Sequence, residues 1–266
     1  MNLLQHQEYA LKLDFNKGLI KESRSDPLIV ICNGPSLKGF NFNDIRDFPS
    51  IGMNAAYRMF ERIDFWPTYF CCADLRVGMF HSTEYERLLQ EKESVFFLRE
   101  NATNKIKLNK NINRNKVFTL NCSSNPSLQF DLRERSVSVF SPNSTGYISC
   151  ILGIALHFKN IILLGADCNY TEIIDGAKQT ETGHGHGGAR LTLTKTPSAN
   201  PNYWFDDYQQ KGDEYHVPHG STVHMQGWAQ LASIAKQHNI NVINCSITSK
   251  IPFFQKIPFN DVISSL

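Results

Sequence analysis

The stretch IVICNGPSLKGFNF, residues 29–42, decides how the rest of this chain is interpreted. Its first four residues are apolar, three of them are β-branched, and the run stops at Asn33-Gly34-Pro35-Ser36. Buried strands of parallel sheets are short apolar runs, and glycine and proline mark the turns that end them. The stretch therefore predicts a buried strand over residues 28–32 that ends in a polar turn.

Further short apolar runs follow along the chain and alternate with amphipathic stretches of helical periodicity. This alternation predicts an α/β fold, a Rossmann-like and mainly parallel sheet flanked by helices. Single α/β domains often reach about 200–250 residues, so we predict one domain over residues 28–266, preceded by a helix over residues 1–27. The other predicted strands are residues 50–53, 68–73, 95–98, 117–120, 161–164 and 242–244.

Small and polar residues follow four of the predicted strands directly. Asn33 and Gly34 follow the first strand, Asn54 the second and Asp74 the third, and residues 165–167, Gly-Ala-Asp, follow the strand over 161–164. In an open α/β sheet, ligands bind in the crevice outside the carboxyl ends of the strands. A turn former explains each residue alone, but their recurrence at strand ends predicts a binding site.

The segment 142–170 is the clearest supersecondary unit of the sequence. Ser144 or Thr145 can cap a helix whose apolar residues recur at helical spacing, and Gly146 follows them. Two hydroxyls beside the unpaired N–H groups of a helix start suit a phosphate or a carboxylate. The sequence leaves both an anion site and an ordinary helix cap open.

Residues 171–215 carry little hydrophobic periodicity and are rich in Gly, Thr, His, Asn and Asp. A connection of this length without evident secondary structure is usually a functional lid or a disordered insert. We predict a lid insertion here. Its pairs of metal-ligand residue types, His184 with His186 and Asp206 with Asp207, are more typical of a solvated loop, and no metal is expected.

Three histidines lie within nine residues where helical periodicity returns. His216 and His219 precede a predicted helix over residues 223–238, and His224 lies in its first turn. The positive end of the helix dipole disfavours imidazolium, so a histidine there tends to stay neutral, as a general base must be. We predict that one of the three is functional.

Composition excludes several classes of protein. The net charge is +2 and no basic stretch is interleaved with aromatic residues, so no nucleic-acid partner is expected. Seven cysteines without a CxxC motif predict reduced thiols in a cytoplasmic protein. No secretory signal and no apolar run of about 18–20 residues is present. Attachment to the inner face of a membrane, and a homo-oligomer formed through the aromatic tail over residues 250–266, stay open.

Two motifs resemble the bacterial sialyltransferases of glycosyltransferase family 42. IVICNGPSLKGFNFNDI (residues 29–45) is similar to the family's nucleotide-binding strand and loop, and STGYISCILGIALHFKNIILLGAD (residues 144–167) to its Thr-Ser-Gly helix and following strand. YHVPHG (residues 215–220) loosely resembles the family's Tyr-x-x-x-His motif. The NGPSL loop also resembles the flagellin-modifying motility accessory factors and a pterin diphosphokinase-like group.

The resemblance implies a GT-A-like variant of the fold and an inverting, metal-independent glycosyltransferase. It would move a nonulosonic acid, such as sialic acid or Kdo, from its CMP-activated form to a hydroxyl of a glycan acceptor such as lipooligosaccharide or capsule. His219 would be the base, Tyr170 and Tyr215 would support the reaction, and no cofactor is needed beyond the donor. The implied donor contacts are Asn33, Gly34, Pro35, Ser36, Asn54, Asp74, Asn143, Ser144, Thr145, Gly146, Gly165 and Asp167.

The sequence also departs from that family's pattern. Ile162 stands where the family has a tyrosine, Tyr170 is shifted by one residue, and Asp74 replaces the usual asparagine. Two other classes therefore stay open, a nucleotide-binding module without catalysis and a Mg²⁺- and ATP-dependent diphosphokinase of the pterin type. The candidate metal ligands of such a kinase are Asp74, Asp167, Asp206 and Asp207.

Overall fold

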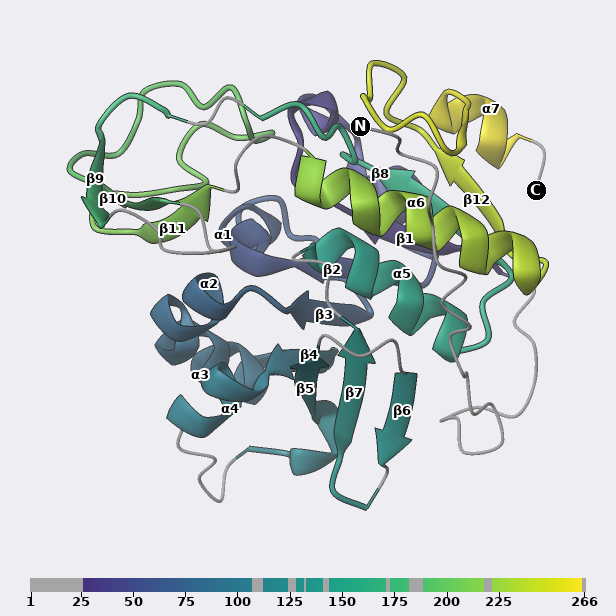
Figure 1. The fold of residues 1–266 in the computed structure, drawn as a ribbon, viewed down its shortest axis with the longest axis horizontal. Helices are drawn as coiled ribbons and strands as arrows, with labels where there is room; N and C mark the ends of the chain where they lie inside the picture. Colours follow the sequence, from purple (N-terminus) through teal and green to yellow (C-terminus); the bar gives the residue numbers. More distant parts are fainter. Residues whose placement is uncertain are drawn as a thin grey trace, which may run out of the picture.

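The computed structural model describes residues 26–106, 112–123, 128–131, 133–140, 144–170, 173–181, 189–217 and 222–264. Its centre is a ten-stranded sheet in the order β13-β12-β8-β1-β2-β3-β4-β5-β7-β6 (Figure 1). Every pairing in this sheet is parallel except that of β6 with β7. The predicted α/β class, a mainly parallel sheet flanked by helices, is confirmed.

Every predicted strand is present, because strands buried on both faces are continuous apolar runs in the sequence. The pattern does not predict the last strand at one end of the sheet or the last two at the other, because one has two residues and the others alternate apolar with polar residues. The strands of this sheet are β1 (Leu28–Ile31), β2 (Ser50–Met53), β3 (Tyr69–Cys72), β4 (Val95–Arg99), β5 (Val117–Ser123), β6 (Leu128–Asp131), β7 (Ser136–Phe140), β8 (Asn160–Leu164), β12 (Asn241–Asn244) and β13 (Gln255–Lys256).

Alternating side chains of the central strands form one core on each face of the sheet. Leu28 and Val30 pack with α5 (Thr145–Ala155) and α6 (Thr222–Gln237), which lie side by side across the sheet in Figure 1. The other face is covered by α1 (Tyr57–Phe60), α3 (Ser82–Glu91), α4 (Glu100–Lys105) and α7 (Phe259–Ile263). Helix α2 (Leu75–Phe80) follows β3, and 3-10 turns η2 (Pro35–Leu37), η3 (Phe42–Ile45), η4 (Asn54–Ala56) and η5 (Arg114–Lys116) join other elements.

The insertion over residues 171–215, with the two residues after it, contains strands that the sequence pattern does not predict. Strands β9 (Ala177–Glu181), β10 (Ala189–Leu193) and β11 (Glu214–Val217) form a separate antiparallel sheet, at the left of Figure 1. The sequence shows no strand pattern here, because these largely polar strands are held by backbone pairing rather than by an apolar face. That the insertion acts as a lid stays a prediction.

The two ends of the chain are described to different extents. The predicted N-terminal helix over residues 1–27 lies almost wholly outside the described residues. The C-terminal tail packs on the core through Ile251, Phe259 and Val262. The seven cysteines all lie in the described ranges, and none of them is in a disulfide bond there. Within the described ranges, no helix is both long and apolar enough to span a bilayer.

Candidate functional site

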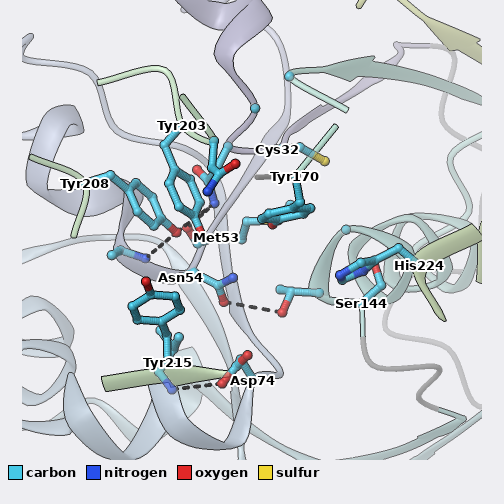
Figure 2. Close-up of a pocket in the computed structure, with 18 of the residues that line it drawn as sticks. Cys32, Met53, Asn54, Asp74, Ser144, Tyr170, Tyr203, Tyr208, Tyr215 and His224 are labelled. Carbon is cyan, nitrogen blue, oxygen red and sulfur yellow. Dashed lines mark hydrogen bonds between the residues drawn. The ribbon is translucent and has the colours of Figure 1, made fainter. Parts of the chain in front are cut away.

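A pocket of about 360 Å³ opens at the carboxyl ends of the central strands, between the start of α5 and the insertion (Figure 2). The sheet order explains its position, because β1, β2, β3 and β8 are neighbours and their following turns meet at one edge. Most of the predicted site residues therefore come together. Those that line the pocket are Asn33, Gly34, Pro35, Asn54, Asp74, Ser144, Thr145, Gly146, Gly165, Asp167, Tyr170 and Tyr215.

The turn after β1 and the Gly-Ala-Asp turn after β8 pack directly against each other. The Gly34 N–H donates to the Gly165 carbonyl at 2.9 Å, and the Ser36 N–H donates to the Asp167 carboxylate at 2.7 Å. A Cβ atom on Gly34 would lie 2.3 Å from Asp167 Oδ2. Glycine is therefore required at position 34 for this wall of the pocket to close.

Ser36 is placed differently from its prediction. Its side chain is exposed, its hydroxyl donates to Ser246 Oγ at 3.0 Å, and it is not among the residues that line the pocket. What Ser36 contributes to the wall is its backbone N–H on Asp167.

Asn54 connects the end of β2 to the start of α5. Its backbone is left-handed, with φ 57°, a conformation that asparagine tolerates better than most residues. The Asn54 Oδ1 atom accepts a hydrogen bond from the Thr145 hydroxyl at 3.3 Å. Ser144 is the N-cap of α5 and accepts from the Tyr147 N–H at 3.3 Å. The helix start is thus both capped and open to the pocket.

Asp74 has a structural role as well as a place in the pocket wall. Its Oδ1 atom accepts hydrogen bonds from the N–H groups of Arg76 and Val77 at 2.8 and 2.9 Å, which makes it the N-cap of α2. This capping role is sufficient to explain why an aspartate follows β3, so the residue type alone does not indicate a bound ligand.

Aromatic side chains form the wall opposite the strand ends (Figure 2). The Tyr170 ring stacks on His224, with ring centroids 5.6 Å apart, and meets Tyr203 edge-on. Tyr203 stacks on Tyr208 at 3.8 Å. Sequence reasoning assigned no role to Tyr203 or Tyr208, although the density of aromatic residues in PNYWFDDY (residues 201–208), within an otherwise polar segment, is a signal that could have found them.

Burial favours the uncharged forms of two pocket side chains, His224 and Tyr215. It lowers the pKa of His224, against an opposing effect of the nearby Asp74 carboxylate, so this imidazole is neutral at pH 7. Burial raises the pKa of Tyr215 to about 12, and its buried hydroxyl has no hydrogen-bond partner among the described residues. The pocket thus presents a neutral base and a phenol that can donate a proton in a hydrogen bond.

Comparison with known proteins identifies the family of this chain. Residues 1–172 match the model of the family described as 6-hydroxymethylpterin diphosphokinase MptE-like. This chain belongs to that family. The matched MptE-like region includes the NGPSL turn, Asn54, Asp74, the start of α5 and Asp167, and it confirms the resemblance to the pterin diphosphokinase-like group.

Two solved structures are also similar, and no match was found among curated proteins. Both are structures of the sialyltransferase CstII from Campylobacter jejuni. The complex with cytidine-5′-monophosphate is 14% identical, covers 89% of this chain and 87% of the other, and has a TM-score of 0.36. The complex with CMP-3FNeuAc is 13% identical, covers 88% and 86%, and has a TM-score of 0.38.

The predicted histidines of this MptE-like chain are described to different extents. His219 lies outside the described residues, as do Asn143, His184 and His186, and His216 is described only as a backbone position of β11. Among the described side chains, His224 is the one of the three predicted candidates that lines the pocket. The assignment of His219 as the base stays a prediction.

The two adjacent aspartates of the insertion, Asp206 and Asp207, are engaged away from the pocket. Asp207 forms a two-bond ion pair with Arg62, at 2.8 and 2.5 Å, and Asp206 lies 3.9 Å from Lys38. Neither aspartate lines the pocket. Within the part of the chain that the structure describes, no group of three His, Cys, Asp or Glu side chains is placed to hold a metal ion.

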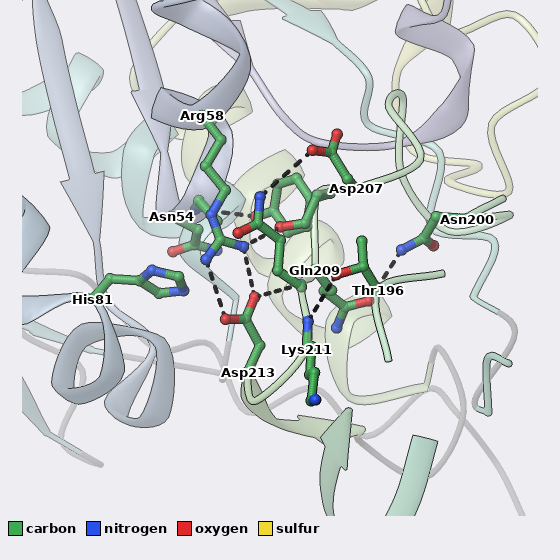
Figure 3. Close-up of polar contacts among 12 residues, drawn as sticks. Asn54, Arg58, His81, Thr196, Asn200, Asp207, Gln209, Lys211 and Asp213 are labelled. Carbon is green, nitrogen blue, oxygen red and sulfur yellow. Dashed lines mark hydrogen bonds and ion pairs between the residues drawn. The ribbon is translucent and has the colours of Figure 1, made fainter. Parts of the chain in front are cut away.

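A second polar network anchors the insertion to the sheet (Figure 3). The Arg58 guanidinium, from α1, donates to both carboxylate oxygens of Asp213 at 2.6 and 3.1 Å and to the Tyr208 carbonyl at 2.7 Å. Asp213 directly precedes β11, which carries Tyr215. The pair therefore holds one wall of the pocket in place.

Proposed function

We propose that this chain binds a CMP-activated nonulosonic acid, such as sialic acid or Kdo, and transfers the sugar with inversion to a hydroxyl of a glycan acceptor. The observation that carries the proposal is the juxtaposition, in one pocket, of the α5 start with a neutral histidine, His224 (Figure 2). The helix start suits the phosphate of the donor, and the imidazole suits the acceptor hydroxyl.

The phosphate end of the site is built from hydrogen-bond donors. The α5 helix is eleven residues long, so its N-terminus carries a substantial positive dipole. The Ser144 and Thr145 hydroxyls and the Tyr215 phenol line the same pocket. Neutral donors of this kind can stabilise the charge that develops on a leaving group with a single phosphate, without a metal ion.

In the proposed chemical step, His224 acts as the base while the sugar moves from CMP to the acceptor hydroxyl. The acceptor oxygen forms a bond to the anomeric carbon, the bond between that carbon and the phosphate oxygen breaks, and CMP leaves with the electron pair. His224 takes the acceptor proton, and the nearby Asp74 carboxylate stabilises the imidazolium that results. The proposed setting is cytoplasmic, at the inner face of the membrane, with a surface polysaccharide or lipooligosaccharide as acceptor.

The family description raises a second candidate, a Mg²⁺- and ATP-dependent pterin diphosphokinase. Its two candidate ligands in the insertion, Asp206 and Asp207, lie away from the pocket. Asp74 and Asp167 each accept backbone N–H groups. The pocket therefore supports the transferase better, and ligand binding separates the two candidates.

We expect CMP to raise the thermal unfolding temperature without added metal. A ligand at 100 times its Kd stabilises the native state by about 2.7 kcal/mol, which shifts Tm by several degrees. A thermal-shift series with CMP, UDP, GDP and ATP, each with and without Mg²⁺, measures this. Stabilisation by ATP that requires Mg²⁺, together with no response to CMP, would reject the transferase and support the kinase.

We expect His224→Ala to lower sugar transfer from a CMP-activated donor by about 10²–10⁴-fold, the usual contribution of a general base. CMP affinity should change little, because the base acts on the acceptor. Turnover and CMP binding are measured for this variant beside His219→Ala. Near-normal turnover in His224→Ala, with loss in His219→Ala, would assign the base to His219 instead.

A further inference from the structure

Tyr208 reaches from the insertion into the crevice between β1 and β2. Its hydroxyl oxygen accepts a hydrogen bond from Asn33 Nδ2 at 3.1 Å and another from the Ala55 N–H at 3.3 Å. Both side chains are buried, Tyr208 to 5% exposure and Asn33 to 9%. A residue far along the chain thus contacts the turn that ends the first strand.

These contacts determine which way the Asn33 amide points. Its Nδ2 group also donates to the Met53 carbonyl at 3.3 Å, so both amide hydrogens have acceptors. A flipped amide would place Oδ1 against a carbonyl oxygen, which is repulsive. The Oδ1 atom is left buried in the pocket wall without a hydrogen-bond partner among the described residues. An unsatisfied buried acceptor is costly and points to a donor on a ligand.

Asp167 presents a second acceptor of the same kind. Its Oδ2 atom accepts the Ser36 N–H at 2.7 Å, while its Oδ1 atom is buried and has no partner among the described residues. The residue is 4% exposed and lines the pocket. A carboxylate and an amide oxygen repel a phosphate, whereas they suit O–H or N–H donors.

We propose that Tyr208 is a positioning residue that holds Asn33 so that its Oδ1, together with Asp167 Oδ1, accepts hydrogen bonds from the nucleoside half of the ligand. This rests on the proposed function in one respect, that a nucleotide occupies the pocket. The ribose hydroxyls and an exocyclic amino group are the donors that a nucleoside offers. The phosphate then points to the start of α5, so the wall also sets the direction of the nucleotide.

Tyr208→Phe tests this role, because it removes only the hydroxyl and keeps the ring that stacks on Tyr203. Kd values for CMP, 2′-deoxy-CMP, 3′-deoxy-CMP and UMP are measured by calorimetry on the wild type and the variant. We expect the wild type to prefer CMP by about tenfold over at least one analogue that lacks a donor, and the variant to reduce this preference to about twofold. A loss of preference over a deoxy analogue identifies a ribose hydroxyl as the donor, whereas a loss of preference over UMP identifies the amino group.

Tyr147→Phe is the matched control, since it removes the hydroxyl of a buried tyrosine that does not line the pocket and should keep the preference. Equal weakening of all four ligands by Tyr208→Phe would show a merely structural role and overturn the inference while the transferase stands. Binding of ATP but not CMP, with a preference over 2′-deoxy-ATP or 3′-deoxy-ATP that is lost in Tyr208→Phe, would support the inference and reject the transferase. Absence of all nucleotide binding by the wild type would reject both.

Discussion

Replacing Gly34 with alanine is expected to abolish nucleotide binding and to lower the free energy of unfolding by about 3 kcal/mol, the upper end of overpacking costs. The added Cβ would lie 2.3 Å from Asp167 Oδ2 and 2.6 Å from the Gly165 carbonyl oxygen. Neither atom can move freely, because Asp167 accepts the Ser36 N–H and the Gly165 carbonyl accepts the Gly34 N–H. The turn must therefore separate from the Gly-Ala-Asp turn, and the pocket wall opens.

Gly39→Ala is the control for this prediction. Gly39 has a positive φ of 80°, but a Cβ there meets no atom within 4 Å. Its substitution reports backbone strain alone, about 1 kcal/mol, and should leave nucleotide affinity unchanged. Denaturant unfolding and calorimetry with CMP measure both quantities. A Gly34→Ala protein that binds CMP like the wild type would contradict the contact between the two turns.

Arg58→Ala is expected to cost about 3–5 kcal/mol of stability, because it leaves the Asp213 carboxylate buried without its partner. The two side chains are 13% and 8% exposed, and the guanidinium also holds the Tyr208 carbonyl. Losing this anchor should release Tyr208 and Tyr215 from the pocket wall. We therefore expect weaker nucleotide binding in the same variant, measured at a temperature where it remains folded.

The neighbouring pair of Arg62 with Asp207 is a matched control of similar geometry. It is also bidentate, but its side chains are 46% and 32% exposed. Exposed pairs contribute about 0–1 kcal/mol, so Arg62→Ala should have a small effect. The double variant Arg58→Ala/Asp213→Ala should lose less stability than the sum of its single changes. Equal costs for Arg58→Ala and Arg62→Ala would show that burial of the first pair does not matter.

Local patterns determined the sheet and the line of residues at its edge. Buried parallel strands are continuous apolar runs, and the residue after each strand is read directly from the sequence. Because parallel strands share one carboxyl edge, Asn33, Asn54, Asp74 and Asp167 could be predicted to lie along that edge, and the order of the strands then brings them together. The cap of α5 at Ser144 follows from the same kind of local rule.

Only the tertiary structure decided what those residues do at the edge. The Asn33 amide is oriented by a tyrosine 175 residues away, and Arg58 pairs with an aspartate 155 residues away. No local periodicity encodes such contacts, because they depend on how the insertion packs against the sheet. Other long-range contacts turn the Ser36 hydroxyl toward Ser246 and bring His224 and Tyr203 into the pocket wall. The sequence thus placed the site, and long-range packing determined which of its atoms face a ligand.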